Sequence, residues 1–486
     1  MNRCGHWIGC FLALMGAAAL TGADFLLPAE NPLGMRTYTQ TVELTYPDAA
    51  AAGSAALTAA PLPYGKKLAV SCRWDDTNPN HVRMHDLMVK HGFRGTFYLC
   101  DLNASSGKSW FKGYLEKLRE GGCTVGAHGM KHANLRDLAA KDPNGVFREL
   151  GASRAQLEAA IDAPVNTHAF AYGAYSKKGE PAIGRTIADT YTRCGFTHDT
   201  YSGFPVSTQG LRQSDISSEG RIQPGDRDTK AEKFAEHVAK GIANEKAMKV
   251  NPNLTVGVHT WQKGRDWEEL EAGFAQHAGR PDWWYCTNNE YGAYRYEFHH
   301  ARIEKVSTQG NKVVWKITRM VPAELGSSVP LFLESPGATA ATVDGRTVKL
   351  AQPGVLALEH SPEQRIPEQI SWLSNPENRA DFAAPAKLAG VSAGLWFDAG
   401  SGALMLKLDN RSGAVLKNPA LTVRLPLAWS PGVLRRQLED LPAGVRTIRI
   451  DLPARRAELG ERPFFWCELD YDGPSGRGRI HATCNR

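Results

Sequence analysis

The stretch Leu68–Asp76 reads Leu-Ala-Val-Ser-Cys-Arg-Trp-Asp-Asp, an apolar run that ends in two adjacent carboxylates. A short apolar run that stops at polar residues is typical of a buried β-strand. Further along the chain, Val125–His132 reads Val-Gly-Ala-His-Gly-Met-Lys-His and places two histidines where another strand should end. Two imidazoles and one carboxylate are a usual ligand set for a zinc ion with an open coordination position. The two stretches therefore indicate metal-assisted hydrolysis.

Between residues 64 and 300, short apolar runs alternate with segments of helical periodicity. This alternation predicts a parallel sheet covered by helices, and about seven such units approach the number in a (β/α) barrel. In such folds the chemistry collects at the carboxyl ends of the strands. Five side chains that can do chemistry are predicted to lie at strand ends: Asp75, Asp76, His128, Tyr172 and His259. We therefore expect an α/β fold, a distorted (β/α) barrel, over residues 64–300.

The flanking regions have a different character. Residues 1–23 carry an early arginine, a short apolar stretch and then small residues, the pattern of a secretory signal peptide, so we expect a secreted or periplasmic protein. Residues 24–63 hold one alternating stretch and an Ala-rich run, which we interpret as a leading strand and a linker. After residue 300, strand-like runs recur without helices. They predict all-β, sandwich-like modules: a small β module with a connector over 301–385 and an Ig-like β-sandwich over 386–486.

The composition limits the classes of partner that we expect for this protein. The 486 residues include 57 Lys and Arg against 51 Asp and Glu, for a net charge of +6. These charges are dispersed, so nucleic acid is not indicated as a partner. Beyond the signal peptide, no segment is apolar over a length that predicts a stable membrane span. The sequence makes no prediction of the oligomeric state.

The nine cysteines do not suggest a metal site. No Cys-x-x-Cys pair occurs, so a zinc ion held by cysteines is not favoured. Cys467 and Cys484 lie on neighbouring predicted strands and are the best candidates for a disulfide in an oxidising compartment.

The residues from about 66 to 300 resemble the polysaccharide deacetylases, the NodB-homology group of family 4 carbohydrate esterases. The first motif of that family ends in Asp-Asp, where the first Asp is the catalytic base and the second a metal ligand. The resemblance therefore implies these roles for Asp75 and Asp76. The second motif is His-Ser/Thr-x-x-His, which implies that His128 and His132 are metal ligands. Gly129 stands here in place of the Ser or Thr.

The remaining motifs match less closely. The fifth motif is an apolar strand that ends in His, so His259 would be the general acid. The third motif is Arg-x-Pro-Tyr followed by Gly, and 169–173 matches its end but lacks the Arg and the Pro. The backbone N–H of Tyr172 can still contribute to an oxyanion hole, as the resemblance implies. Arg73 and His168 are the alternatives for the missing Arg, which holds the base carboxylate in the family.

Two further residues are assigned by weaker signals. The fourth motif, an Asp that tunes the acidic His, has no clear counterpart, and Asp199 is the candidate. Trp261, two residues beyond His259, is the tryptophan that we favour for a contact with a sugar ring. The other tryptophans are expected in the core.

We therefore expect a secreted, metal-dependent deacetylase that removes N- or O-acetyl groups from a polysaccharide or oligosaccharide by the attack of metal-activated water. Zinc is the expected cofactor, with cobalt and nickel as alternatives, and an acetylated glycan is the expected partner. Two other functions are compatible with the same residues. One is a non-catalytic carbohydrate-binding protein on this scaffold, and the other is a metal-dependent amidase that acts on C–N bonds outside sugars.

Overall fold

In the computed structural model, the described residues fall into several ranges. They are 37–141, 145–146, 148–161, 163–175, 179–180, 183–184, 187, 190–191, 194, 196, 198–199, 221–222, 231–245, 252–257, 259–364, 388–425, 433–453 and 464–485. The predicted signal peptide, 1–23, lies outside them. In the part of the chain that is described, no helix combines the length and the apolar character needed to cross a membrane.

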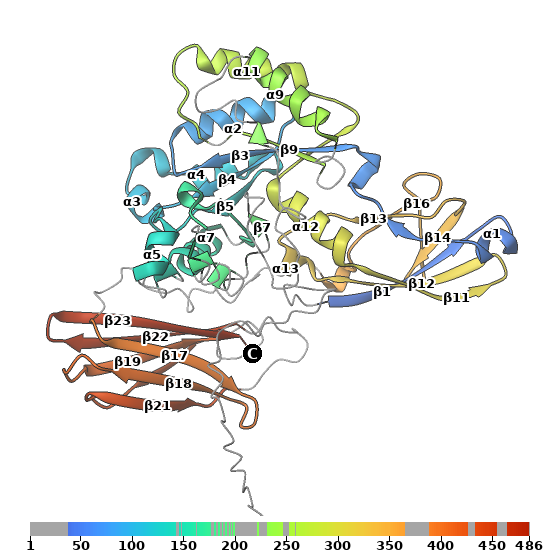
Figure 1. The fold of residues 1–486 in the computed structure, drawn as a ribbon. Coiled ribbons are helices and arrows are strands. Elements are labelled where there is room, and N and C mark those ends of the chain that lie inside the picture. Colours follow the sequence, from blue (N-terminus) through green and yellow to red (C-terminus); the bar gives the residue numbers. More distant parts are fainter. Residues whose placement is uncertain are drawn as a thin grey trace, which may run out of the picture.

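An eight-stranded parallel sheet forms the centre of the molecule (Figure 1). Seven strands follow the order β7-β6-β5-β4-β3-β9-β8, and β10 also pairs with β3. Their bounds are β3 (Leu68–Asp75), β4 (Gly95–Leu99), β5 (Thr124–Ala127), β6 (Thr167–His168), β7 (His198–Asp199), β8 (Arg221–Ile222), β9 (Asn253–Val256) and β10 (Trp283–Cys286). Among the described residues the end strands β7 and β8 do not pair, so the predicted α/β architecture is present as an open, barrel-like sheet.

The strand that the sequence singled out, β3, is the hub of this sheet. All eight of its residues are buried, as expected for a parallel strand that is covered on both faces. It pairs with β4 along 72–75, with β9 along 69–72 and with β10 along 68–71. Its carboxyl end therefore points into the region where β4, β5 and β9 also end.

Helices cover the sheet and complete its core (Figure 1). They are α2 (Asn80–Lys90), α3 (Leu102–Ser106), α4 (Tyr114–Leu118), α5 (Leu135–Lys141), α7 (Ser153–Ile161), α9 (Ala231–Ala243), α11 (Asp266–His277) and α12 (Asn288–His300). The start of α12 has a capping box, because Thr287 Oγ1 accepts from the Glu290 N–H at 3.1 Å and the Glu290 carboxylate accepts from the Thr287 N–H at 2.9 Å. This cap fixes where the last helix of the domain begins.

The segment before β3 folds with residues far along the chain. β1 (Thr37–Thr45) pairs with β12 (Lys312–Met320) and β14 (Ala340–Val343) in the antiparallel sheet β11-β12-β1-β14-β15, whose other strands are β11 (Arg302–Gln309) and β15 (Arg346–Val348). A second sheet has the order β16-β13-β2, with β2 (Thr58–Ala59), β13 (Leu331–Glu334) and β16 (Val355–Leu358).

The interpretation of the Ala-rich run as a linker needs correction. Ala49–Gly53 forms the short helix α1, capped by Asp48, whose carboxylate accepts from the Ala51 N–H at 2.8 Å. Ala52 is fully buried in the same apolar cluster as Trp315 and Leu333. Helix formation and burial depend on these distant strands, which local composition does not reveal.

The C-terminal region consists of two antiparallel sheets. One has the order β17-β18-β21 and the other β20-β19-β22-β23, and both contribute to one buried apolar cluster. The bounds are β17 (Val391–Asp398), β18 (Ala403–Asn410), β19 (Lys417–Arg424), β20 (Val433–Gln437), β21 (Gly444–Ile450), β22 (Phe464–Gly473) and β23 (Gly476–Asn485). An all-β module thus follows the (β/α) domain, and its likeness to Ig domains stays a prediction.

The cysteine pairing in this module stays a prediction as well. Cys467 is buried on β22, whereas the side chain of Cys484 on β23 lies outside the described residues. The register places Cys467 opposite Ala482 and Cys484 opposite Phe465.

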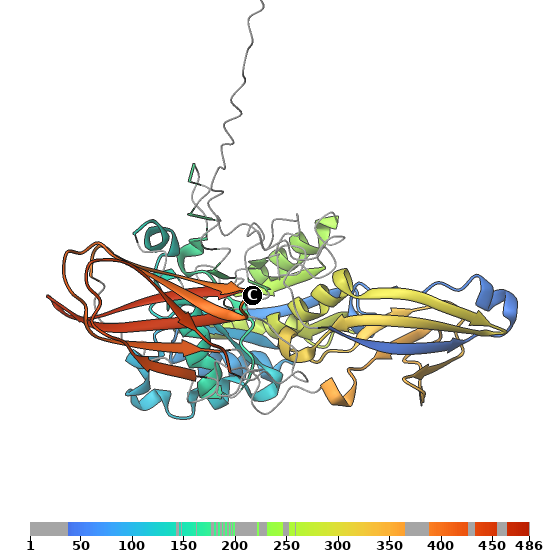
Figure 2. The ribbon, with the colours of Figure 1, turned by 90° about the horizontal axis from the view of Figure 1, so that it is seen from below.

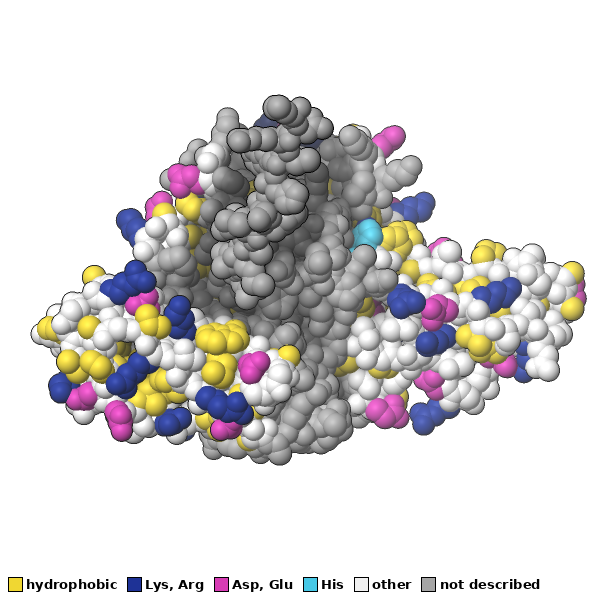
Figure 3. Space-filling model, turned by 60° about the horizontal axis from the view of Figure 1, so that its bottom comes forward, with side chains coloured by type: hydrophobic (Ala, Val, Ile, Leu, Met, Phe, Trp, Pro, Cys, Tyr) yellow, Lys and Arg dark blue, Asp and Glu magenta, His cyan; other side chains and the backbone are white. Residues whose placement is uncertain are grey.

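The antiparallel sheets that contain β1 and β13 form a second β module. This module and the C-terminal module lie toward opposite ends of the molecule (Figure 2). On the described part of the face in Figure 3, Lys and Arg side chains are interspersed with Asp and Glu side chains over both modules. This agrees with the dispersed charge of the sequence.

Candidate metal centre and active site

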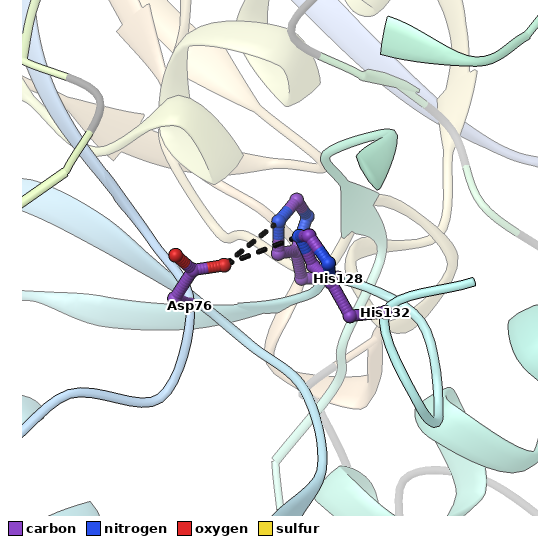
Figure 4. A group of neighbouring side chains, drawn as sticks. All are labelled: Asp76, His128 and His132. Carbon is purple, nitrogen blue, oxygen red and sulfur yellow. Dashed lines mark ion pairs between the residues drawn. The ribbon is translucent and has the colours of Figure 1, made fainter. Parts of the chain in front are cut away.

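Asp76, His128 and His132 converge at the carboxyl ends of β3 and β5 (Figure 4). Asp76 Oδ1 lies 3.5 Å from His128 Nε2 and 3.2 Å from His132 Nε2. One ligand atom from each residue lies within 4.8 Å of the others, as a shared metal ion requires. Asp76 and His132 have positive φ angles of 73° and 57°. Such backbone strain is found at functional sites, where the surrounding structure holds it in place.

A backbone hydrogen bond orients His128. Its Nδ1–H donates to the Ala169 carbonyl at 2.7 Å, because β5 and β6 pair beside this point. Nε2 therefore faces Asp76, as the coordinating nitrogen of a metal-binding histidine does. This orientation and the donor set of the site both fit a divalent metal ion.

Arg73 binds both carboxylate oxygens of Asp75. Arg73 Nε donates to Asp75 Oδ1 at 2.8 Å and Nη2 donates to Oδ2, and both residues are buried. Residues two apart on a strand point to the same face, which explains how neighbours on β3 can pair. Of the two alternatives for the missing third-motif Arg, the structure places Arg73 on the Asp75 carboxylate. His168 is buried among the rings of Phe170 and Phe196 instead.

This pairing keeps Asp75 ionised. Burial alone would raise the pKa of Asp75, but the charge of Arg73, followed by that of His128, lowers it below its ordinary value. Asp75 Oδ2 lies 4.0 Å from His128 Nε2, so the carboxylate faces the metal-ligand cluster. For Asp76, burial is likewise outweighed by hydrogen bonds and charges from His128 and His132, which lower its pKa.

His259 reaches the same cluster from β9. Its Nε2 lies 3.9 Å from Asp76 Oδ2. The ring stacks on the indole of Trp261, with centroids 4.0 Å apart and planes 2° from parallel. Glycine is needed at position 257, directly after β9, because its φ is 89° and a Cβ there would lie 2.3 Å from the Trp74 ring.

Tyr172 contacts the cluster through the ring of His132. It has a φ of 58° in the turn Ala171–Gly173, and its ring packs edge-on against His132 at 4.7 Å. That the backbone N–H of Tyr172 contributes to an oxyanion hole stays a prediction. So does the tuning role of Asp199, which lies on β7 with its side chain outside the described residues.

His81 supports the turn after β3, a role that its position on a helix did not reveal. Its Nε2–H donates to the Asp75 carbonyl at 3.1 Å, and its Nδ1 accepts from the Tyr114 hydroxyl at 2.7 Å. Burial lowers the pKa of His81 to about 4, so the ring is neutral near pH 7.

Glu149 supports the loop between His128 and His132. Its Oε2 accepts from the Lys131 N–H at 2.9 Å. Gly129, where the family has Ser or Thr, has a φ of 87°, and a Cβ there would lie 2.9 Å from the same carboxylate oxygen. A carboxylate from elsewhere in the chain thus lies next to the site of the substitution. No motif in the sequence pointed to Glu149.

Residues 64–185 match the family model described as polysaccharide deacetylase. The resemblance found in the sequence is therefore confirmed over these residues, which are part of the range of about 66 to 300 that the sequence indicated. The segment contains the Asp-Asp pair, His128, His132 and Tyr172. His259 lies beyond the matched residues, although it reaches the same site. A search of curated proteins finds no matching sequence.

Several solved structures of deacetylases are also similar to the chain. The catalytic domain of a peptidoglycan N-acetylglucosamine deacetylase from Eubacterium rectale is 14% identical, with 46% of this chain and 90% of that chain covered and a TM-score of 0.31. The peptidoglycan deacetylase PdaC from Bacillus subtilis is 11% identical, with 46% and 90% covered and a TM-score of 0.31. A family 4 carbohydrate esterase from Streptomyces lividans in complex with acetate is 11% identical, with 43% and 88% covered and a TM-score of 0.29. We draw no conclusion about function from similarities of this size.

Proposed function

We propose that this protein is a metal-dependent deacetylase that removes N- or O-linked acetyl groups from a polysaccharide or oligosaccharide. One observation carries the proposal: the ligand set Asp76, His128 and His132 lies beside an ionised, Arg73-bound Asp75. If the Arg73–Asp75 pair were only structural, a metal-ligand set beside it would have no purpose. Hydrolysis at a metal needs both a ligand set and a base. The family match over residues 64–185 supports acetyl groups on sugars as the substrate class.

Asp76, His128 and His132 would hold the metal ion, and zinc is the ion that we propose, with cobalt and nickel as substitutes. When bound, such an ion lowers the pKa of a water ligand and polarises the acetyl carbonyl. A site with three protein ligands would keep a coordination position open for this chemistry.

The surrounding residues would handle the protons. Asp75 accepts a proton from the attacking water, and Arg73 keeps its carboxylate ionised and fixed in orientation. The water oxygen forms a bond to the acetyl carbon, and the Tyr172 N–H would bind the oxyanion. When the bond from that carbon to the sugar nitrogen or oxygen breaks, His259 protonates the leaving atom. Acetate and a free amine or hydroxyl are the products.

The Arg73–Asp75 pair also bears on the alternative of a non-catalytic sugar-binding protein. That alternative rested on the missing third-motif Arg, without which the base carboxylate would lack its partner. Because Arg73 supplies two hydrogen bonds to Asp75, the absence of the Arg at position 169 no longer argues against catalysis.

Acetate release tests the proposal. The metal-free protein, prepared with a chelator, is incubated with chitin oligomers, peptidoglycan, poly-N-acetylglucosamine and acetylated xylan, with and without added zinc. We expect zinc-dependent acetate release from at least one polymer. The variant Asp86→Asn removes an exposed carboxylate outside the site and serves as the control. Release from small amides but from no glycan would favour the amidase alternative and contradict the proposal.

We further propose that the protein is exported and that its N-terminal segment is removed. The signal-like pattern of residues 1–23 motivates this. N-terminal sequencing of the protein recovered from the periplasm or medium should begin near residue 24, and an intact N-terminus in the cytoplasm would contradict it.

A further inference from the structure

The β module that contains β1 and β13 has a cavity lined by residues of β14, β15 and β16 (Figure 1). Its volume of about 670 Å³ falls within the range of pockets that bind small ligands. Val343, Val348 and Leu350 line it and stay partly exposed, while they also pack against the apolar cluster of the module. None of these strands belongs to the candidate metal centre or to the matched residues 64–185. The cavity is therefore a separate candidate site.

Ala357, which also lines the cavity, points its backbone N–H and C=O away from β13. Strand β16 is an edge strand in the order β16-β13-β2. Opposite Ala357 on β13 is Phe332, whose C=O accepts from the Ala60 N–H at 2.8 Å, beside β2. Phe332 and Ala357 are thus a non-hydrogen-bonded pair of the ladder, and the polar groups of Ala357 face the free edge.

The neighbours of Ala357 along this edge are already bonded. Val355 exchanges two hydrogen bonds with residues 351 and 352 in the turn before it, at 2.8 and 2.9 Å. The Glu359 C=O accepts from Gln40 Nε2 at 3.1 Å. Ala357, between them, has no backbone hydrogen-bond partner among the residues that the structure describes. It therefore keeps a free donor and a free acceptor inside the cavity.

The hairpin of β14 and β15 lies antiparallel to β16 along the cavity. At one end, Oδ2 of its turn residue Asp344 lies 3.5 Å from Oγ of Ser361, which follows β16. At the other end, Ala351 after β15 bonds to Val355 at the start of β16. The cavity therefore has a Glu359 end and a Val355 end.

The two ends of the cavity differ in charge. Asp344, Glu359 and Glu363 line it toward the Glu359 end, where Arg346 is also present, and Lys349 lines it toward the Val355 end. None of these side chains forms an ion pair with another residue in the described ranges. The Glu359 end is thus suited to a cationic group and the Val355 end to an anionic one.

A buried network holds the Glu359 end in shape. Arg319 donates to His360 Nε2 at 3.1 Å, and the His360 Nδ1–H donates to the Tyr38 hydroxyl at 2.8 Å. His360 lines the cavity, and so does Gln40, which is only 2% exposed. Because these groups already have partners, this end is formed before a ligand arrives.

We infer that the cavity binds a short extended peptide, which runs antiparallel to β16 and exchanges two hydrogen bonds with Ala357. This is strand addition at a sheet edge, in which backbone bonds give affinity and the surrounding side chains give specificity. A tripeptide is long enough, because the edge positions on both sides of Ala357 are occupied. In this direction its amino terminus lies at the Glu359 end and its carboxylate near Lys349. The inference does not depend on the proposed function.

Tripeptides with free termini test the inference. The full-length protein is titrated calorimetrically with Lys-X-Val, where X is Ala, Val or Leu, and we expect at least one peptide to bind at a single site. Methylation of the X nitrogen should weaken binding about fivefold, because it removes the N–H that donates to Ala357. Ala357→Pro removes the donor on the protein side and should weaken binding by a similar factor. Proline is tolerated there because the lost N–H faces the free side of an edge strand.

Lys349→Glu tests the direction of the peptide. It should weaken binding of the free-acid peptides about tenfold and leave binding of their C-terminal amides nearly unchanged. Lys407→Glu, at an exposed lysine on β18 of the C-terminal module, is the matched control and should bind as the parent protein does.

If no peptide binds at millimolar concentration, or if N-methylation and Lys349→Glu leave the affinity unchanged, the inference is wrong. Self-association of the parent protein that Ala357→Pro abolishes, with no peptide bound, would assign this edge to a second copy of the chain and also overturn it.

Discussion

The guanidinium of Arg73 binds both oxygens of Asp75 from two positions earlier on the same buried strand. In most parallel strands these positions hold apolar side chains that pack against a covering helix. Here the Arg73 guanidinium and the Asp75 carboxylate occupy these positions, and each is hydrogen-bonded to the other in a buried environment. Removing one member of such a pair destabilises the protein, because the other is then left charged and buried.

The first prediction concerns Arg73. We expect Arg73→Gln to lower kcat by about a hundredfold, because the base loses a bidentate partner that orients it and keeps it ionised. Arg73→Lys should retain more activity, since it keeps the charge but not the planar geometry. Zinc content is the control, because Arg73 binds Asp75 and is not one of the three proposed metal ligands. Parent-like kcat in Arg73→Gln would remove Arg73 from the mechanism.

The second prediction separates the base from the ligand. Asp75→Asn should lower acetate release by roughly two to four orders of magnitude while zinc still binds. Asp76→Asn should lose zinc, because a carboxylate ligand of the metal is removed. Zinc content by elemental analysis and acetate release distinguish the two variants. Equal zinc loss in both would contradict the separate roles that we assign to these neighbours.

The third prediction concerns Glu149. The hydrogen bond from the Lys131 N–H holds the loop that carries both histidine ligands, so Glu149→Ala should weaken zinc binding by about tenfold. Glu149→Gln keeps an acceptor oxygen and should bind zinc almost as the parent protein does. The control is Glu158→Gln, because Glu158 is also buried and also accepts a backbone N–H, that of Val165, but away from the metal ligands.

We expect the control to lower the melting temperature without weakening zinc binding. A calorimetric titration with zinc and a thermal melt measure the two effects separately. If Glu149→Ala and Glu158→Gln change only the melting temperature, Glu149 is a structural residue and not a positioning one.

The fourth prediction is a pH dependence of stability. Burial lowers the pKa of His81 to about 4, below the ordinary value of 6.5. Between these values the unfolded chain binds a proton that the folded protein does not, so the free energy of unfolding falls as the pH falls from about 6.5 to about 4. One such group contributes up to about 1.4 kcal/mol per pH unit.

Denaturant unfolding of the parent protein and of His81→Gln, at several pH values in this range, measures the effect. The variant should show a shallower dependence, because glutamine has no proton to gain. His168, His277 and His360, whose pKa values are also lowered by burial, contribute to the slope that remains. An unchanged slope in His81→Gln would contradict the prediction.

Local sequence was sufficient to predict the parallel α/β domain and the cluster of Asp76, His128 and His132. Apolar runs such as Leu68–Trp74 predict buried strands, and polar residues directly after them are carried to one edge of the sheet. Asp76, His128 and His132 therefore meet as expected. The sequence could not show that Ala49–Gly53 is a packed helix, because its partners lie on β11 and β12, more than two hundred residues later.

The kinds of chemical group at the site, and their order along the chain, were determined by the sequence alone. Which of these groups touch was decided only by the tertiary structure. Two candidates were available to hold Asp75, and strand geometry selected Arg73, since side chains two apart on β3 share a face. The contacts of Glu149 and His81 likewise join separate elements. Such contacts have no local signature, because they arise from the way in which strands and helices pack.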